Sequence, residues 1–266
     1  MRAVLLIARK EFADCIRNRW LVFGAILFAV LSVAVFFGTA AIGGTLQYQP
    51  LATVMSSLLS LTVFVLPLLA LMLSYDAFVG EEEAGTLLLM LTYPITRTEW
   101  LLGKTCGQAA ALACVLTAGF AVLPVLHLFL DVPYGMGALL QSVATLVATG
   151  WLLGIVFMLA AYWVSLSVRH KAQALALLLV VWFVVVLLYD LALLVVSVAG
   201  ADVLSRTTLV GLMLVNPASV FRLVNQSVLG IAPLALPAVS VMIGIMFAWI
   251  AALFGICRTV FVLRRL

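Results

Sequence analysis

Long apolar stretches separated by short polar segments dominate the chain. Six of them exceed the roughly 20 residues that a helix needs to cross about 30 Å of hydrocarbon, and they contain a single acid and a single histidine. Each run is continuous, whereas strands of a membrane barrel alternate over about ten residues. The pattern predicts an all-α membrane protein of six transmembrane helices: Trp20–Ile42, Val54–Tyr75, Thr105–Leu130, Ala138–Val168, Ala172–Ala199 and Ile231–Cys257.

The first polar segment, residues 1–19, is amphipathic. Leu5, Ala8, Phe12 and Ile16 recur at helical spacing, and the basic side chains take the other side. Such a segment lies along a membrane surface, so we expect an N-terminal interfacial helix. It serves either as an anchor that sets the topology, which is the favoured interpretation, or as a lever that leads into the first span and senses a cytoplasmic partner.

The loop at residues 76–100 has helix signals of its own. Three acids, Glu81–Glu83, precede a Leu-rich run, which predicts a short helix with negative charge at its positive N-terminal end. Pro94 ends that helix. Thr96 and Glu99 then have the spacing of a capping box, in which each side chain accepts a free N–H of the next helix.

The loop at residues 200–230 separates the fifth and sixth spans. Its pattern predicts short amphipathic helices that lie outside the membrane or dip into it.

Composition and charge agree with one membrane domain. Hydrophobic residues make up 67% of the 266 positions and charged ones 9%, against about 25% charged in soluble domains. We therefore expect residues 1–266 to form a single transmembrane domain. All Lys and Arg side chains except Arg206 and Arg222 fall on one side of the predicted spans, which makes that side and both termini cytoplasmic. This bias explains the net charge of +4 and removes the case for a nucleic-acid partner.

Motifs typical of nucleotide-binding, metal or redox sites are missing from the sequence. Gly103-Lys104-Thr105 has the end of a phosphate-binding loop, but Thr98 stands where that loop needs glycine, and the segment leads into lipid. The two histidines lie outside any HExxH motif, and the four cysteines lack CxxC spacing, so we expect free thiols. We expect no catalysis, cofactor or metal site on this chain.

Three residues within the spans are candidates for a cargo path. Asp190 is the acid within a span, and a charge in that place is a functional candidate. A structural role at the outer interface, where Asp190 caps a helix or pairs with Arg206 or Arg222, is favoured. Met242 and Met246 share a helix face and could bind Cu(I), although ordinary packing is the favoured reading for them.

The loop at residues 76–100 resembles the membrane subunit of ABC exporters of the ABC-2 type. The resemblance rests on Gly80-Glu-Glu-Glu-Ala-Gly-Thr-Leu87, Pro94-x-x-Arg97 and Leu102-Gly-Lys104, and on Asn216-Pro217 followed by Arg222 in the outer loop. Within that class, the chain is similar to permeases that serve the maturation of the copper enzyme nitrous oxide reductase. The six-span layout extends the resemblance over the whole chain.

The resemblance implies a permease homodimer in the bacterial inner membrane, driven by a separate cytoplasmic ATPase dimer that binds ATP and Mg. It implies a copper or sulfur cargo and a periplasmic accessory protein. The positions that match the ATPase-coupling element are Glu81, Glu82, Glu83, Gly85, Thr86 and Arg97. Those that match the contact with the periplasmic protein are Asn216, Pro217 and Arg222.

Two other classes of protein remain open. A self-sufficient secondary transporter or channel usually places several ionisable groups at mid-membrane or contains internal repeats, and this chain has one such acid and no visible repeat. A membrane anchor for a sensor complex is the other. Co-purification of an ATPase separates both from the exporter.

Overall fold

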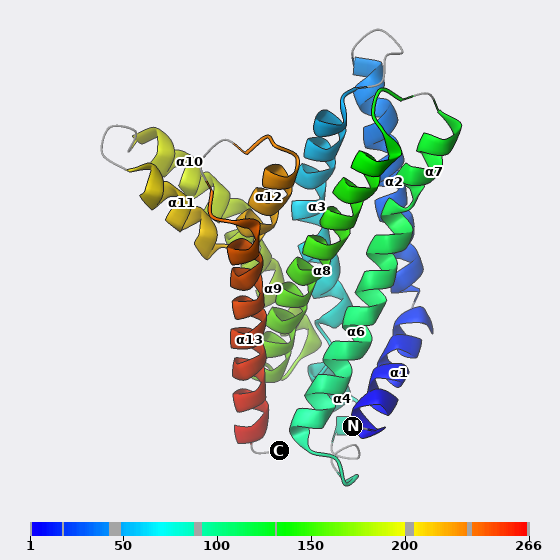
Figure 1. Ribbon diagram of the computed structural model, residues 1–266. Coiled ribbons are helices and arrows are strands. Elements are labelled where there is room, and N and C mark those ends of the chain that lie inside the picture. Colours follow the sequence, from blue (N-terminus) through cyan, green and yellow to red (C-terminus); the bar gives the residue numbers. More distant parts are fainter. Residues whose placement is uncertain are drawn as a thin grey trace.

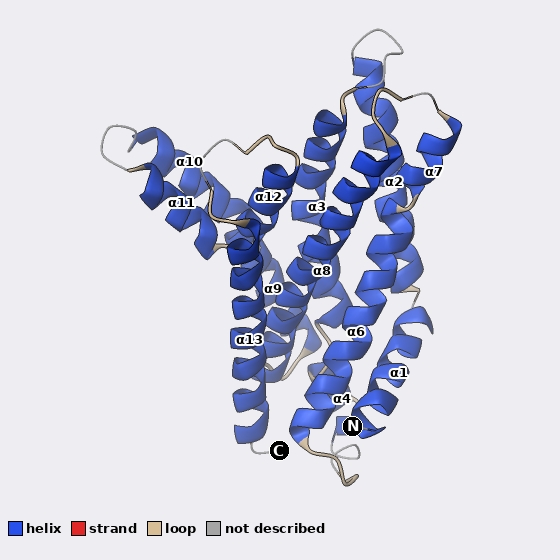
Figure 2. Ribbon diagram, in the orientation of Figure 1, coloured by secondary structure: helices blue, strands red, loops and turns tan. Residues whose placement is uncertain are grey.

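The computed structural model describes residues 2–17, 19–42, 49–87, 92–130, 132–199, 205–232 and 236–264. These residues form helices joined by loops, without a strand among them (Figure 2). Six of the helical segments are long and apolar enough to cross a membrane, which confirms the predicted all-α fold with six spans.

The first half of the chain supplies three spans and two short helices. Helix α1 covers Arg2–Arg17, and α4 covers Val79–Glu83. The spans are α2 (Trp20–Ile42), α3 (Leu51–Ser74), and α6 (Arg97–Phe120) continued by α7 (Val122–Phe129). The third span breaks at Ala121 because Pro124 has no N–H to donate to the carbonyl of Phe120.

The second half supplies the other three spans. They are α8 (Met136–Ser167), α9 (Lys171–Trp182) continued through a π-helical turn η1 (Phe183–Leu188) into α10 (Tyr189–Ala199), and α13 (Val239–Leu263). Between the last two lie α11 (Arg206–Val215) and α12 (Pro217–Val228), which meet at 117°.

Helix α8 is the centre of the bundle, with contacts to α3, α6, α12 and α13. Helix α12 packs among α3, α8 and α13, whereas α10 and α11 form an arm that projects from the bundle (Figure 1). Helix α1 begins and α13 ends at one end of the molecule, hereafter the terminal end; the opposite end is the far end (Figure 1). An even number of spans requires this placement of the two termini.

Small residues bring α1 against α6. A Cβ atom on Gly103 would lie 2.6 Å from Ile7, and one on Gly107 would lie 2.5 Å from the carbonyl oxygen of Ala8. The Gly103–Gly107 spacing is therefore a close-packing surface, as this motif provides between membrane helices. The outward side of α1 carries Leu5, which is 72% exposed.

The predicted bounds of the sixth span, Ile231–Cys257, were wrong at both ends. The span covers Val239–Leu263, and it begins late since Pro237 favours an extended conformation at the residue before it and Ala238 is the extended N-cap. The segment 200–230 contains short helices, as predicted, and α12 packs into the far half of the bundle. The Leu-rich run predicted to extend the short helix falls at 88–91, outside the described residues.

Candidate functional site

Helix α4 lies at the terminal end of the molecule, and side-chain hydrogen bonds fix both its first and its last turn. The backbone N–H groups of Phe78 and Val79 donate to Oγ of Ser165 on α8, at 3.1 and 3.0 Å. Gly85 ends the helix with a φ of +69°, a conformation open to glycine at no steric cost. Thr86 donates its hydroxyl back to the carbonyl of Glu81 at 3.1 Å. The sequence thus produces a short, fixed helix.

Glu81 belongs to a buried ion cluster. Its carboxylate lies 2.8 Å from Nζ of Lys104 on α6, and the same ammonium lies 3.1 Å from Glu11 on α1. Lys104 is 2% exposed and lies over the rings of Phe78 and Trp100. One cation between two carboxylates joins α1, α4 and α6.

The pKa of Glu11 reflects this cluster. Burial by itself raises the pKa of the Glu11 carboxyl, because a charged group loses its hydration. The charges of Lys104 and Lys10, with their hydrogen bonds, outweigh burial and bring the pKa below its ordinary value. The net direction shows that Glu11 is ionised and holds α1 through charge.

The other two glutamates of α4 reach different helices. Glu82 accepts a 2.7 Å hydrogen bond from Arg264, just past the end of α13. Glu83 accepts at 3.0 Å from the backbone N–H of Lys171, the first residue of α9, and lies 3.6 Å from His170 in the link between α8 and α9. The three adjacent acids therefore bind three different parts of the bundle, rather than forming one solvated face.

Arg97 stabilises the end of α13. Its guanidinium donates to the carbonyl oxygens of Phe261, Val262 and Arg264, groups that a helix end leaves unpaired. Thr96 and Glu99 form the predicted capping box at the start of α6, which the structure confirms. Arg97 therefore connects the start of the third span to the end of the sixth.

These contacts make α4 a mechanical junction. A displacement of α4 acts on α6 and α1 through Glu81, on α13 through Glu82, and on α8 and α9 through Ser165 and Glu83. Packed helices shift as rigid bodies, so α4 lies where a displacement would bear on several spans.

A second cluster lies at the far end. Asp190, at the start of α10, forms a 2.6 Å ion pair with Arg222 on α12, one of the two partners expected for it. The pair lies at a largely apolar cavity of about 460 Å3 between α10, α11 and α12. Asp190 thus fastens α12 to the fifth span, and a role in a cargo path stays a prediction.

Asn216 and Pro217 set the position of α12. Asn216 caps the helix by accepting from Ala218 N–H at 2.9 Å, and its amide donates to the carbonyl of Val185 in the π-helical turn at 2.6 Å. Pro217 occupies the first turn, where its missing N–H costs nothing. Both residues are buried, so of the three predicted periplasmic contacts Arg222 is the one with an accessible side chain, and the contact stays a prediction.

The two methionines lie in the core. Met242 and Met246 are fully buried and belong to the main hydrophobic cluster with Phe221 and Val224 of α12. In the described part of the chain, no group of three His, Cys, Asp or Glu side chains has metal-binding geometry. Packing explains both residues, and a cargo role for them stays a prediction.

Sequence reasoning missed four residues of the α4 junction: Glu11, Lys104, Ser165 and Arg264. In the sequence Lys104 contributes to the cytoplasmic bias of Lys and Arg and ends the Leu-Gly-Lys element, and neither pattern identifies its ion-pair partners. Glu11 had a weak signal, because Ile7 and Cys15 flank it at i−4 and i+4 and these three are the residues of α1 buried against the bundle. The partners of Ser165 and Arg264 are distant in sequence, so no local pattern identifies them.

Comparison with known proteins agrees with this geometry. Residues 5–265 match a family model described as ABC-2 family transporter protein. The chain is 44% identical over 229 residues to a probable ABC transporter permease protein NosY of Pseudomonas aeruginosa, covering 85% of this chain and 82% of the relative. A protein of the same name from Stutzerimonas stutzeri is 41% identical over 227 residues, with the same coverage.

Proposed function

The chain belongs to the ABC-2 family of transporter proteins, as a permease subunit of an ABC transporter, and from this we propose that a separate ATPase dimer drives it by pushing on α4. The observation that carries the proposal is the attachment of Glu81, Glu82 and Glu83 to three different parts of the bundle. Gly85, Thr86 and Arg97 complete the ATPase-coupling element.

The state of Lys104 supports ATP hydrolysis on another chain. In Gly103-Lys104-Thr105 the ammonium is buried between Glu11 and Glu81, and is therefore unavailable to a phosphate. ATP and Mg then belong to the partner subunit, and this chain has no cofactor of its own. The Lys and Arg bias makes the terminal end cytoplasmic, so α4 faces the compartment that holds ATP.

Uneven burial supports a homodimer, which the resemblance to ABC-2 permeases places in the bacterial inner membrane. Only 6% of the residues in the most apolar 18-residue stretch of the fifth span are buried inside the structure. The corresponding share for α8 is 67%. Leu191, Leu194, Val195 and Val198 of α10 are all more than half exposed. We propose that a second copy packs against this span, and that a pathway opens between the copies when the ATPase dimer closes.

The cargo and the outer partner follow from the resemblance to permeases of nitrous oxide reductase maturation. We propose a copper or sulfur species as cargo. Asp190, Met242 and Met246 are the candidates along its path. A periplasmic accessory protein would contact the far end near Arg222.

The test combines co-purification with transport. The full chain, expressed with its neighbouring genes, is expected to bring down an ATPase, and vesicles containing the pair should move Cu(I) or sulfide only with ATP. A Glu82→Ala, Glu83→Ala double variant frees α4 from Arg264 and from the start of α9 while keeping the Glu81–Lys104 pair. We expect it to hydrolyse ATP without transport, and the exposed-site variant Arg169→Gln to behave as wild type.

Two outcomes would contradict the proposal. Solute movement by the chain alone, without an ATPase, would make it a secondary transporter or channel. Undiminished transport by the double variant would remove α4 from the coupling route.

A further inference from the structure

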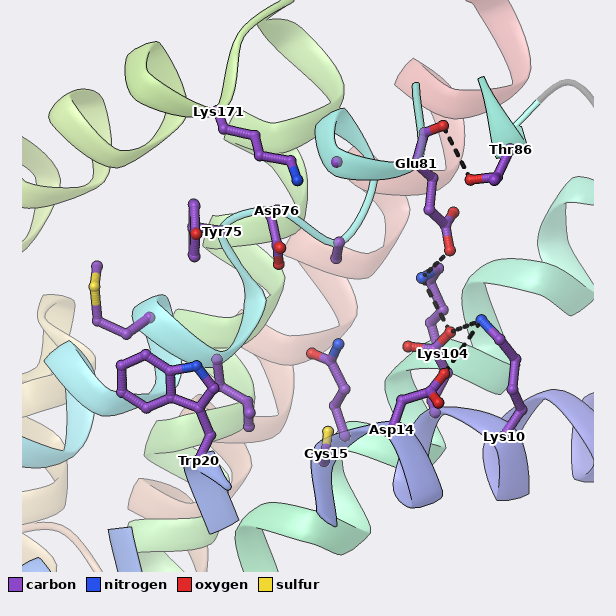
Figure 3. Close-up of a pocket in the computed structure, with 16 residues that line it drawn as sticks. Lys10, Asp14, Cys15, Trp20, Tyr75, Asp76, Glu81, Thr86, Lys104 and Lys171 are labelled. Atoms are coloured by element: carbon purple, nitrogen blue, oxygen red, sulfur yellow. Dashed lines mark hydrogen bonds and ion pairs between the residues drawn. The ribbon is translucent and has the colours of Figure 1, made fainter. Parts of the chain in front are cut away.

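A polar cavity of about 300 Å3 lies beside the α4 junction, bounded by α1, α4, the terminal-end parts of α3 and α6, and the start of α9 (Figure 3). Its volume falls at the lower end of the range typical of small-molecule sites, about 300–1,000 Å3. Three lysines and four carboxylates line it, which leaves one net negative charge: Lys10, Lys104, Lys171, Glu11, Asp14, Asp76 and Glu81.

Two of these charged groups are left over after internal pairing. Lys10 and Lys104 pair with Glu11, Asp14 and Glu81. Among the described residues, the carboxylate of Asp76 and the ammonium of Lys171 have no hydrogen bond or ion pair, and Figure 3 shows both side chains directed toward the cavity. The cavity therefore presents one carboxylate and one ammonium that have no partner among the described residues.

Two further details concern the charged groups that line the cavity. Oε2 of Glu81 is buried without a hydrogen-bond partner, although Oε1 of the same carboxylate binds Lys104. Gly80 leaves room for Lys171, since a Cβ atom there would lie 2.9 Å from Cε of that lysine. The absence of a side chain at Gly80 thus lets the ammonium of Lys171 reach the cavity.

A small apolar crease adjoins the cavity. Trp20 and Leu73 line both the cavity and this crease of about 10 Å3 between α2, α3 and α6, where Leu21, Leu69, Ala111 and Val115 complete the walls. Trp20 starts the first span and Tyr75 follows the end of α3, so the cavity lies at the depth of the membrane interface, where such aromatic side chains gather. The charged head of a membrane lipid fits the cavity, and its apolar tail would lie outside it, in the bilayer beside Trp20.

We propose that this cavity binds the headgroup of a zwitterionic aminophospholipid, whose acyl chains lie in the bilayer beside Trp20. The ammonium of the lipid binds Asp76, and its phosphate binds Lys171. An ammonium carries three N–H donors for the carboxylate of Asp76, which a trimethylated choline lacks. The net negative charge of the lining disfavours anionic lipids such as phosphatidylglycerol.

The experiment measures lipid retention by the purified full chain, together with the subunits that co-purify with it. Delipidated protein is titrated with phosphatidylethanolamine, phosphatidylcholine or phosphatidylglycerol, and bound lipid is counted by native mass spectrometry. We expect preferential retention of phosphatidylethanolamine, and a fall in its affinity of about tenfold in Asp76→Asn and in Lys171→Gln, the loss of one charged hydrogen bond. Neither substitution leaves an internal partner unpaired, so both variants should fold.

Matched controls use the same end of the molecule. Arg169→Gln removes an exposed cation that does not line the cavity, and should retain lipid as wild type. Gly80→Ala should weaken retention by displacing Lys171.

Each contrary outcome overturns the proposal. Equal retention of the three lipids, preference for phosphatidylglycerol, or unchanged affinity in both cavity variants would each do so. Competition by water-soluble glycerophosphoethanolamine at the same concentration as the lipid would show that the site binds a free headgroup and not a membrane lipid.

Discussion

Replacing Lys104 with methionine tests the ion cluster that joins α1, α4 and α6. Methionine keeps the apolar stem and removes the ammonium, so Glu81 loses its ion-pair partner and Glu11 keeps only Lys10, at 3.2 Å. Removing one partner of a buried ion pair costs about 3–5 kcal/mol. Because Lys10 still neutralises Glu11, we expect the lower end, about 3 kcal/mol.

The assay compares thermal unfolding of purified variants with wild type. At roughly 2–4 °C per kcal/mol, Lys104→Met should lower the Tm by about 10 °C. Lys10→Met removes a cation whose side chain is 44% exposed, and should cost less than about 1 kcal/mol. Labelling of Cys15, which is buried on α1 and whose pKa burial raises to about 12, should increase in Lys104→Met as α1 detaches.

A compensating variant decides whether charge is the cause. Lys104→Met combined with Glu11→Gln and Glu81→Gln leaves no uncompensated charge, and should recover most of the lost Tm. Wild-type stability in Lys104→Met, or no recovery in the triple variant, would refute the view that this cluster holds α1 and α4 through charge.

Three further results are expected. The pKa of Glu11 is lowered in the folded protein, so this carboxylate stabilises the fold at pH values above its ordinary pKa of 4.5. That stabilisation is lost as the pH falls through the folded pKa. The variant Glu11→Gln should therefore flatten the acid side of a Tm–pH profile. Gly107→Ala should lower the Tm by the equivalent of about 1–3 kcal/mol, since its Cβ would meet backbone of α1 at 2.5 Å, whereas Gly244→Ala, with open space around it, should not. Asn216→Ala removes the α12 cap and a bond to the π-helical turn, and should cost about 1–3 kcal/mol by the same measurement; an unchanged Tm would contradict this role.

The spans could be predicted from the sequence because hydrophobic length alone specifies them. The first span was predicted at the residues where α2 lies, and Thr96 and Glu99 revealed the start of α6 through a local capping pattern. The family was recognisable for a related reason, since three of the motif pieces lie close together in residues 80–104 and the fourth, Asn216-Pro217 with Arg222, is also local.

The functional contacts were harder to predict because their partners are distant in sequence. In the sequence nothing distinguishes Glu81 from an exposed acid. Lys104, its ion-pair partner, is 23 positions away, and Glu11, the other acid of the cluster, is 70 positions away. For α12 the sequence left two placements open, outside the membrane or dipping into it, since polar residues such as Asn225 also suit a surface helix. In the structure that amide is buried and donates to Thr149 on α8 at 2.8 Å.

The π-helical turn of the fifth span has an evolutionary consequence. A π turn holds one residue more than an α turn, as a single-residue insertion would leave it. Deleting one residue within 183–188 would restore regular α geometry and leave the residues beyond it in nearly the same phase, because the wider π turn already absorbs the extra residue, so Asp190 would still face Arg222. Homologues that lack the extra residue should therefore keep this ion pair, whereas a deletion in the regular helix of α10 before Asp190 would turn the acid away from Arg222.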